Sequence, residues 1–93
     1  MAQTMSDLIE IGPPEAWPHG GHDTGLIGPA QLRDAKILSV STREDEVSIG
    51  VKGPNLIGTT LSTFVIKDAD LRTRIMQAVR PGMDVYEAAA APL

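Results

Sequence analysis

The side chains best suited to metal chemistry lie in one short stretch, His19-Gly-Gly-His-Asp23. Two imidazoles and a carboxylate can bind zinc, nickel or ferrous iron, and the two glycines would let the backbone wrap around an ion. No helical spacing holds these ligands, and no fourth ligand can be identified from the sequence. His19, His22 and Asp23 are therefore a candidate metal or small-ligand site, with a simply solvated loop as the alternative.

Motifs for covalent or nucleotide chemistry are missing from the sequence. The chain has no cysteine, which excludes thiolate nucleophiles, zinc ribbons and disulfides. It contains neither a Gly-x-Ser-x-Gly elbow nor a Gly-Lys-Ser/Thr phosphate-binding loop. We therefore expect a protein that is not an enzyme and that carries no cofactor.

Trp17 is the strongest candidate for contact with a partner. Pro13 and Pro14 precede it and Pro18 follows it, so an extended proline-rich arm could present the indole. The alternative is that Trp17 folds back over the sheet and fills a core poor in aromatic residues. That alternative is favoured, because burying so large a side chain is worth ~1.5–3 kcal/mol or more.

Two apolar pairs bounded by glycine are further contact candidates, namely Leu26-Ile27 and Leu56-Ile57. If exposed, such pairs would mark a contact patch, and if buried they would close an end of the core. Core closure is the simpler interpretation of both pairs.

The charge balance limits the classes of partner. The chain has 12 acidic and 8 basic residues, a net charge of −4, so a phosphate backbone would be repelled and nucleic-acid binding is not expected. No apolar run approaches the roughly 20 residues of a membrane span, and the N-terminus does not resemble a secretory signal. A cytoplasmic location is expected. The acidic run Glu44-Asp45-Glu46 is either a solvated turn or part of a face that mimics nucleic acid.

The elements that must position these residues begin with a hairpin over residues 35–52. Val47, Ile49 and Val51 alternate with Ser48, Gly50 and Lys52, so the three aliphatic residues should point inward. The charged residues 43–46 would form the turn. In the first strand, Leu38 and Val40 are expected to share one face, with Ile37 and Ser39 on the other.

The rest of the chain reads as strand, helix and strand. Residues 60–66 are rich in β-branched and aromatic types, residues 69–80 have helical spacing after an N-cap at Asp68, and residues 83–87 alternate again. The predicted fold is α+β, a small antiparallel sheet with one helix packed on one face. A small open barrel, completed by a short strand at residues 8–11, is the minority option.

The predicted domain organisation has three parts: a flexible N-terminal arm with a long Pro/Gly loop over residues 1–29, one α+β domain over 30–88, and a frayed tail over 89–93. The leading hypothesis is a small acidic module for protein–protein interaction, homo-oligomeric or an accessory subunit, that binds neither nucleic acid nor membranes. The alternatives are a metal- or ligand-binding protein and an acidic inhibitor of a nucleic-acid enzyme. The expected contact residues are Trp17, Leu26, Ile27, Leu56 and Ile57.

Overall fold

The computed structural model describes residues 3–17, 29–56 and 58–93. In these ranges the chain forms one antiparallel sheet in the order β1-β2-β3, two α-helices and two 3-10 helices, labelled η. The elements are η1 (Met5–Asp7), η2 (Pro14–Ala16), β1 (Lys36–Arg43), β2 (Glu46–Lys52), β3 (Thr60–Val65), α1 (Ala69–Ala78) and α2 (Val85–Ala90).

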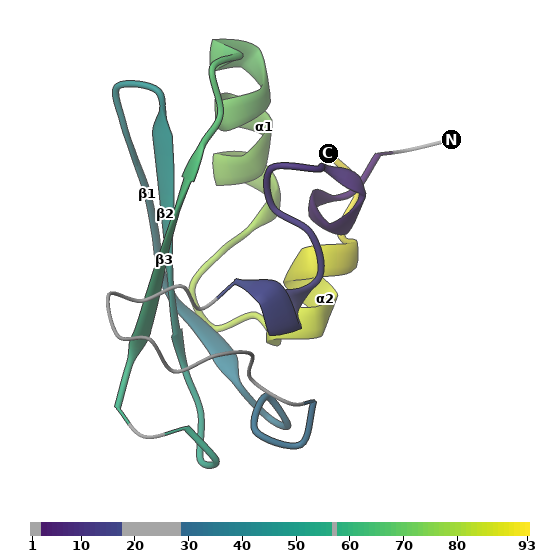
Figure 1. Ribbon diagram of the computed structural model, residues 1–93, viewed down its shortest axis with the longest axis vertical. Helices are drawn as coiled ribbons and strands as arrows, with labels where there is room; N and C mark the ends of the chain where they lie inside the picture. The colour runs from purple at the N-terminus through teal and green to yellow at the C-terminus, as the bar shows by residue number, and fades with distance from the viewer. Residues whose placement is uncertain (1–2, 18–28, 57) are drawn as a thin grey trace.

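The helices and the N-terminal segment lie on one side of the sheet, and the core fills the space between the two layers (Figure 1). The predicted α+β fold is confirmed. The three strands form an open sheet, so the barrel option is wrong. None of the helices in the described ranges has the length and apolarity needed to cross a membrane.

The β1–β2 hairpin forms where the alternation predicts it. Val47, Ile49 and Val51 are all buried on the inner face of the sheet. Arg43 pairs with Glu46 across a two-residue turn, in which Glu44 has a positive φ of 55°. A left-handed residue in such a turn matches the twist of the two strands, which explains how four charged residues close a tight hairpin.

A bulge in β1 overturns the predicted faces of that strand. The register with β2 shifts between Ile37 and Ser39, so Ile37 is buried while Leu38 is 48 % exposed. After the shift, Val40 packs against the core. One extra residue on the bulged strand reverses the alternation, because side chains on a regular strand change face at every residue. Leu38 and Val40 therefore lie on opposite faces.

The strand predicted at residues 83–87 is wrong. Only a short part of this segment pairs with the chain around the start of β1. The Ile37 amide donates to the Met83 carbonyl at 2.8 Å, and the Val85 amide donates to the Ala35 carbonyl at 2.9 Å. The Asp84 side chain then accepts hydrogen bonds from the amides of Tyr86 and Glu87 and starts α2. Alanine, the best helix former, fills the rest of α2.

Helix α1 begins as predicted. The Asp68 carboxylate accepts hydrogen bonds from the amides of Asp70 at 3.0 Å and Leu71 at 3.3 Å. Ile75 is buried between the helix and the sheet. The helix ends at Ala78, two residues before the predicted end, and the buried Val79 is its C-cap.

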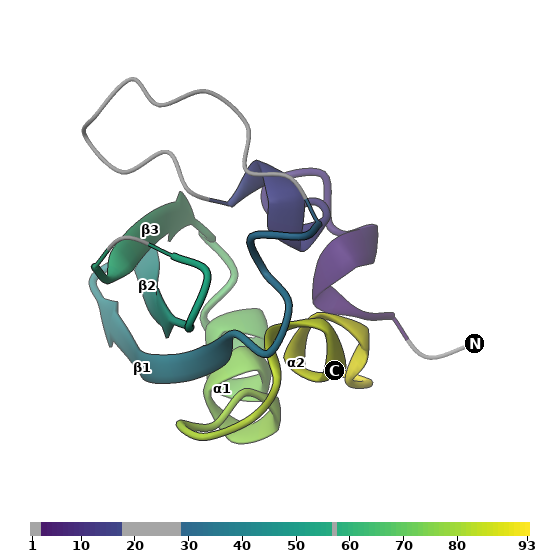
Figure 2. The ribbon, with the colours of Figure 1, turned by 90° about the horizontal axis from the view of Figure 1, so that it is seen from below.

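The N-terminal segment, which we expected to be part of a flexible arm, folds onto the helical layer. Met5, Leu8 and Ile11 are buried in the core. Residues 8–11 form a turn instead of the suggested short strand, since the amides of Ile11 and Gly12 both donate to the Leu8 carbonyl. The segment lies beside α2 (Figure 2).

The C-terminus, expected to be frayed, is held by the same layer. Ala88 and Ala89 are buried in α2, and the Leu93 amide donates to the Gln3 carbonyl at 2.8 Å. The two ends of the described chain therefore support each other at one side of the core.

Candidate interaction surface

Trp17 lies in the core, not on the surface. Its side chain is 1 % exposed, and its ring contacts Phe64 of β3 edge-to-face, with centroids 6.2 Å apart. The indole Nε1–H donates to the Gly12 carbonyl at 2.9 Å. Proline-flanked Trp17 thus packs the N-terminal segment against the sheet, and its side chain is not available to a partner in this arrangement.

Most of the other candidate residues lie outside the described residues: Leu26, Ile27, Ile57, His19, His22 and Asp23. Leu56 is described, and it is half-buried against the core. Within the described ranges, no three potential metal-ligating side chains come together in a group that could hold an ion. The only predicted contact residue left at least partly on the described surface is therefore Leu56.

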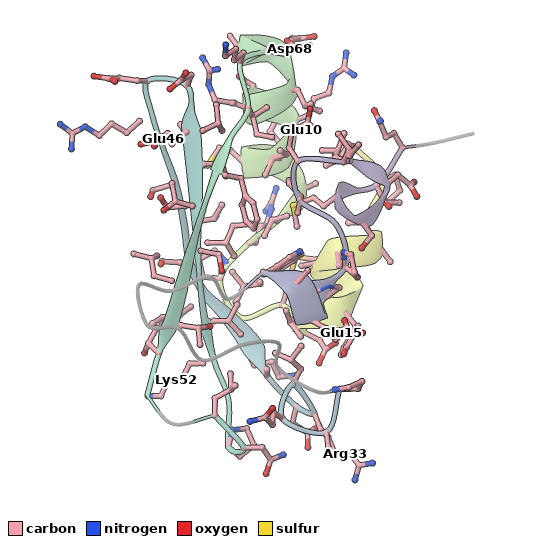
Figure 3. All side chains as sticks on the ribbon, in the orientation of Figure 1. Glu10, Glu15, Arg33, Glu46, Lys52 and Asp68 are labelled. Atoms are coloured by element: carbon pink, nitrogen blue, oxygen red, sulfur yellow. The ribbon has the colours of Figure 1, made fainter. Side chains whose placement is uncertain are left out.

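The acidic run Glu44, Asp45 and Glu46 forms the tip of the hairpin. Glu46 faces Arg43 across the turn, so the tip carries both signs of charge. Lys52 stands at the other end of β2 (Figure 3). The two ends of the strand are thus charged, and the sheet between them is neutral.

The outer face of the sheet is the surface that no described residue covers (Figure 1). Ser41, Ser48 and Thr63 form a row across the three strands, and the Ser48 and Thr63 hydroxyls lie 3.1 Å apart. Leu61 and Val65 flank this row on β3 and are 55 % and 49 % exposed. A band of small polar and aliphatic side chains therefore faces solvent.

The two edges of this sheet differ in how they are protected. At the β1 edge, Lys36 and Arg43 supply charge, the bulge interrupts the strand, and residues 83–85 pair with its first residues. Charges, bulges and covering segments are the usual devices that prevent edge-to-edge pairing. Strand β3, Thr-Leu-Ser-Thr-Phe-Val, has no charge, proline or bulge.

The pairing of β3 with β2 fixes which backbone groups reach the open edge. The Ile66 amide donates to the Asp45 carbonyl at 2.8 Å. Backbone groups alternate in direction along an antiparallel strand, so the even-numbered residues of β3 direct their N–H and C=O groups toward β2. Leu61, Thr63 and Val65 then direct their N–H and C=O groups outward. Among the described residues, no backbone group pairs with them at that edge.

The chain was compared with protein-family models, curated proteins and solved structures. None of them matches it. A function must therefore be inferred from the geometry of the chain itself.

A second polar cluster joins η2 and α2. The Tyr86 hydroxyl lies near the Glu15 carboxylate, and partial burial together with the negative charge of this carboxylate raises the pKa of Tyr86 above 10.0. The neutral phenol therefore contributes stability below about pH 10, and that contribution is lost as the pH rises through the raised pKa. Glu15 in η2 and Tyr86 in α2 thus bring these two elements together.

The open β3 edge is not among the contact sites predicted from the sequence. The available signal is the uncharged run at residues 60–66, which follows Gly58 and Thr59 and precedes Lys67 and Asp68. That signal indicates an edge only when the strand order is known. A central strand can also lack charged residues, because it is surrounded by protein.

Proposed function

We propose that this chain is a small non-enzymatic protein-interaction module that binds an extended polypeptide segment at the free edge of β3. The observation that carries the proposal is the contrast between the two edges: β1 is charged, bulged and partly covered, while β3 is neutral and regular. In strand addition, main-chain hydrogen bonds supply affinity and side-chain contacts supply specificity.

The geometry of β3 suits such a partner. Leu61, Thr63 and Val65 offer alternating backbone donors and acceptors, and their side chains lie on the outer face, which no described residue covers. A hollow of about 460 Å³ adjoins the end of the strand, between Val65, Leu71 and Glu10. It would accept a side chain of the added strand, and we place the interaction in the cytoplasm as part of the proposal.

The metal-binding and acidic-inhibitor alternatives gain no support from the described residues. The histidine stretch lies outside them, and Arg43 adds a positive charge to the acidic tip of the hairpin. Strand addition at β3 is therefore the function that the described geometry supports best.

A photo-reactive amino acid at position 63 tests this function in cells that express the chain. We expect covalent adducts with polypeptides at position 63, because an added strand would lie against this residue. The matched control is position 41, which lies in the same cross-strand row but on β1. Equal adduct formation at positions 63 and 41, measured by mass spectrometry, would contradict the proposed function.

A further inference from the structure

We infer that the polypeptide bound at the β3 edge is a second copy of this chain, paired β3 to β3 in antiparallel fashion about a twofold axis at Thr63. This inference rests on the proposed function, since it names the partner for the same edge. It joins the two three-stranded sheets into one continuous sheet in the order β1-β2-β3-β3-β2-β1.

The orientation of β3 limits the registers that such a pair can take. A twofold axis perpendicular to the sheet keeps both outer faces on the same side, so an outward-facing residue must stand opposite another outward-facing residue. Leu61, Thr63 and Val65 face outward and also direct their backbone groups to the edge. The symmetric pairing therefore sets the residues that direct backbone groups to the edge opposite one another.

An axis at Thr63 pairs residues 61–65 of each copy. It sets Leu61 of each copy opposite Val65 of the other and sets the two Thr63 residues opposite each other. Aliphatic pairs and threonine pairs are favourable cross-strand neighbours, and no like charges meet within the strand. An axis at Ser62 pairs equally many residues but replaces the Leu61–Val65 pairs with Leu61–Thr63 pairs, and an axis at Phe64 shortens the paired stretch to residues 63–65. The sequence of β3 thus complements itself best in one register.

Symmetric pairing of two copies is disfavoured at the β1 edge. The bulge between Ile37 and Ser39 breaks the regular spacing of β1, and residues 83–85 occupy its first backbone positions. Pairing through β3 alone closes the assembly at two copies and leaves the protected β1 edges outermost. One strand pair makes a small interface, so the dimer is expected to be reversible and concentration-dependent.

Cysteine cross-linking tests both the partner and the register. Because the chain has no cysteine, a single Thr63→Cys substitution can form a disulfide only between two copies. Opposed residues of a hydrogen-bonded antiparallel pair have Cα atoms about 5.5 Å apart, within the range that a disulfide spans. The control is Ser41→Cys, which is also exposed and lies in the same row of side chains.

We expect Thr63→Cys to be converted to a species of twice the chain mass under mild oxidation, while Ser41→Cys stays monomeric. An equimolar mixture of Leu61→Cys and Val65→Cys should form the mixed dimer, and neither variant alone should cross-link. This second set of exposed positions decides the question if Thr63→Cys fails to fold.

Equal cross-linking at positions 63 and 41, or no mixed Leu61→Cys/Val65→Cys dimer, would overturn self-pairing in this register. The proposed function fails separately, when the photo-reactive residue at position 63 captures no polypeptide in excess of position 41. Adducts at position 63 that consist only of other polypeptides would overturn self-pairing and leave the interaction module intact.

Discussion

Replacing Trp17 with alanine is expected to lower the free energy of unfolding by about 3–5 kcal/mol. The side chain is 1 % exposed, packs edge-to-face on Phe64 and donates a hydrogen bond to the Gly12 carbonyl. Its removal would leave a large cavity between the N-terminal segment and the sheet. A chain of 93 residues has a total stability of about 5–14 kcal/mol, so the variant would lose a large part of it.

Urea denaturation followed by far-UV circular dichroism measures this loss without relying on the fluorescence of Trp17. Trp17→Phe keeps an aromatic ring but not the hydrogen bond, and we expect a smaller loss of about 1–2 kcal/mol. Ile9→Ala, at a position that is 94 % exposed and lies outside β3, should change stability by no more than about 0.5 kcal/mol. A Trp17→Ala loss as small as that of Ile9→Ala would show that the indole does not hold the N-terminal segment in the core.

Gly53→Ala is expected to lower the free energy of unfolding by about 1–3 kcal/mol. Gly53 follows β2 at the base of the hairpin, opposite the buried Ala35. An added Cβ would lie 2.8 Å from the Ala35 Cα and 2.9 Å from its Cβ. Both atoms belong to or adjoin the backbone, so the strands themselves would have to move apart. Thermal or urea unfolding measures the loss.

Gly50→Ala is the matched control for this prediction. Its added Cβ would come equally close to another atom, 2.7 Å from the Ser39 Oγ, but that atom is a hydroxyl at an exposed position. Rotation of the Ser39 side chain removes the contact, so we expect a smaller loss than for Gly53→Ala. Equal losses in the two variants would contradict the assignment of the Gly53 effect to the backbone of Ala35.

The elements that the sequence predicts well are those specified locally. The alternation in residues 47–52, the β-branched run at 60–66 and the N-cap at Asp68 each act within a few residues. Each forms the predicted element, and β3 ends at Val65, one residue before the predicted end. A strand was wrongly predicted at residues 83–87 because five alternating residues also fit the start of a helix. Asp84 followed three residues later by Glu87, before a run of alanines, was the helix signal.

The candidate surface was harder to predict because it depends on tertiary structure. The environment of Trp17 depends on a contact with Phe64, far along the chain. Which residues of β1 face solvent depends on a bulge, and no glycine or proline in the strand predicts that bulge. The open edge depends on which strands pair, since the sequence of β3 would suit a central strand equally well.

Amide hydrogen exchange of Leu61, Thr63 and Val65, measured by NMR over a range of protein concentrations, tests the β3 edge most directly. The account predicts rapid exchange of these three amides in dilute protein and increasing protection as the concentration rises. The amides of Ser62 and Phe64, which face β2, should be protected throughout. Exchange that stays rapid at every concentration would contradict self-pairing, and protection already complete in dilute protein would contradict an open edge.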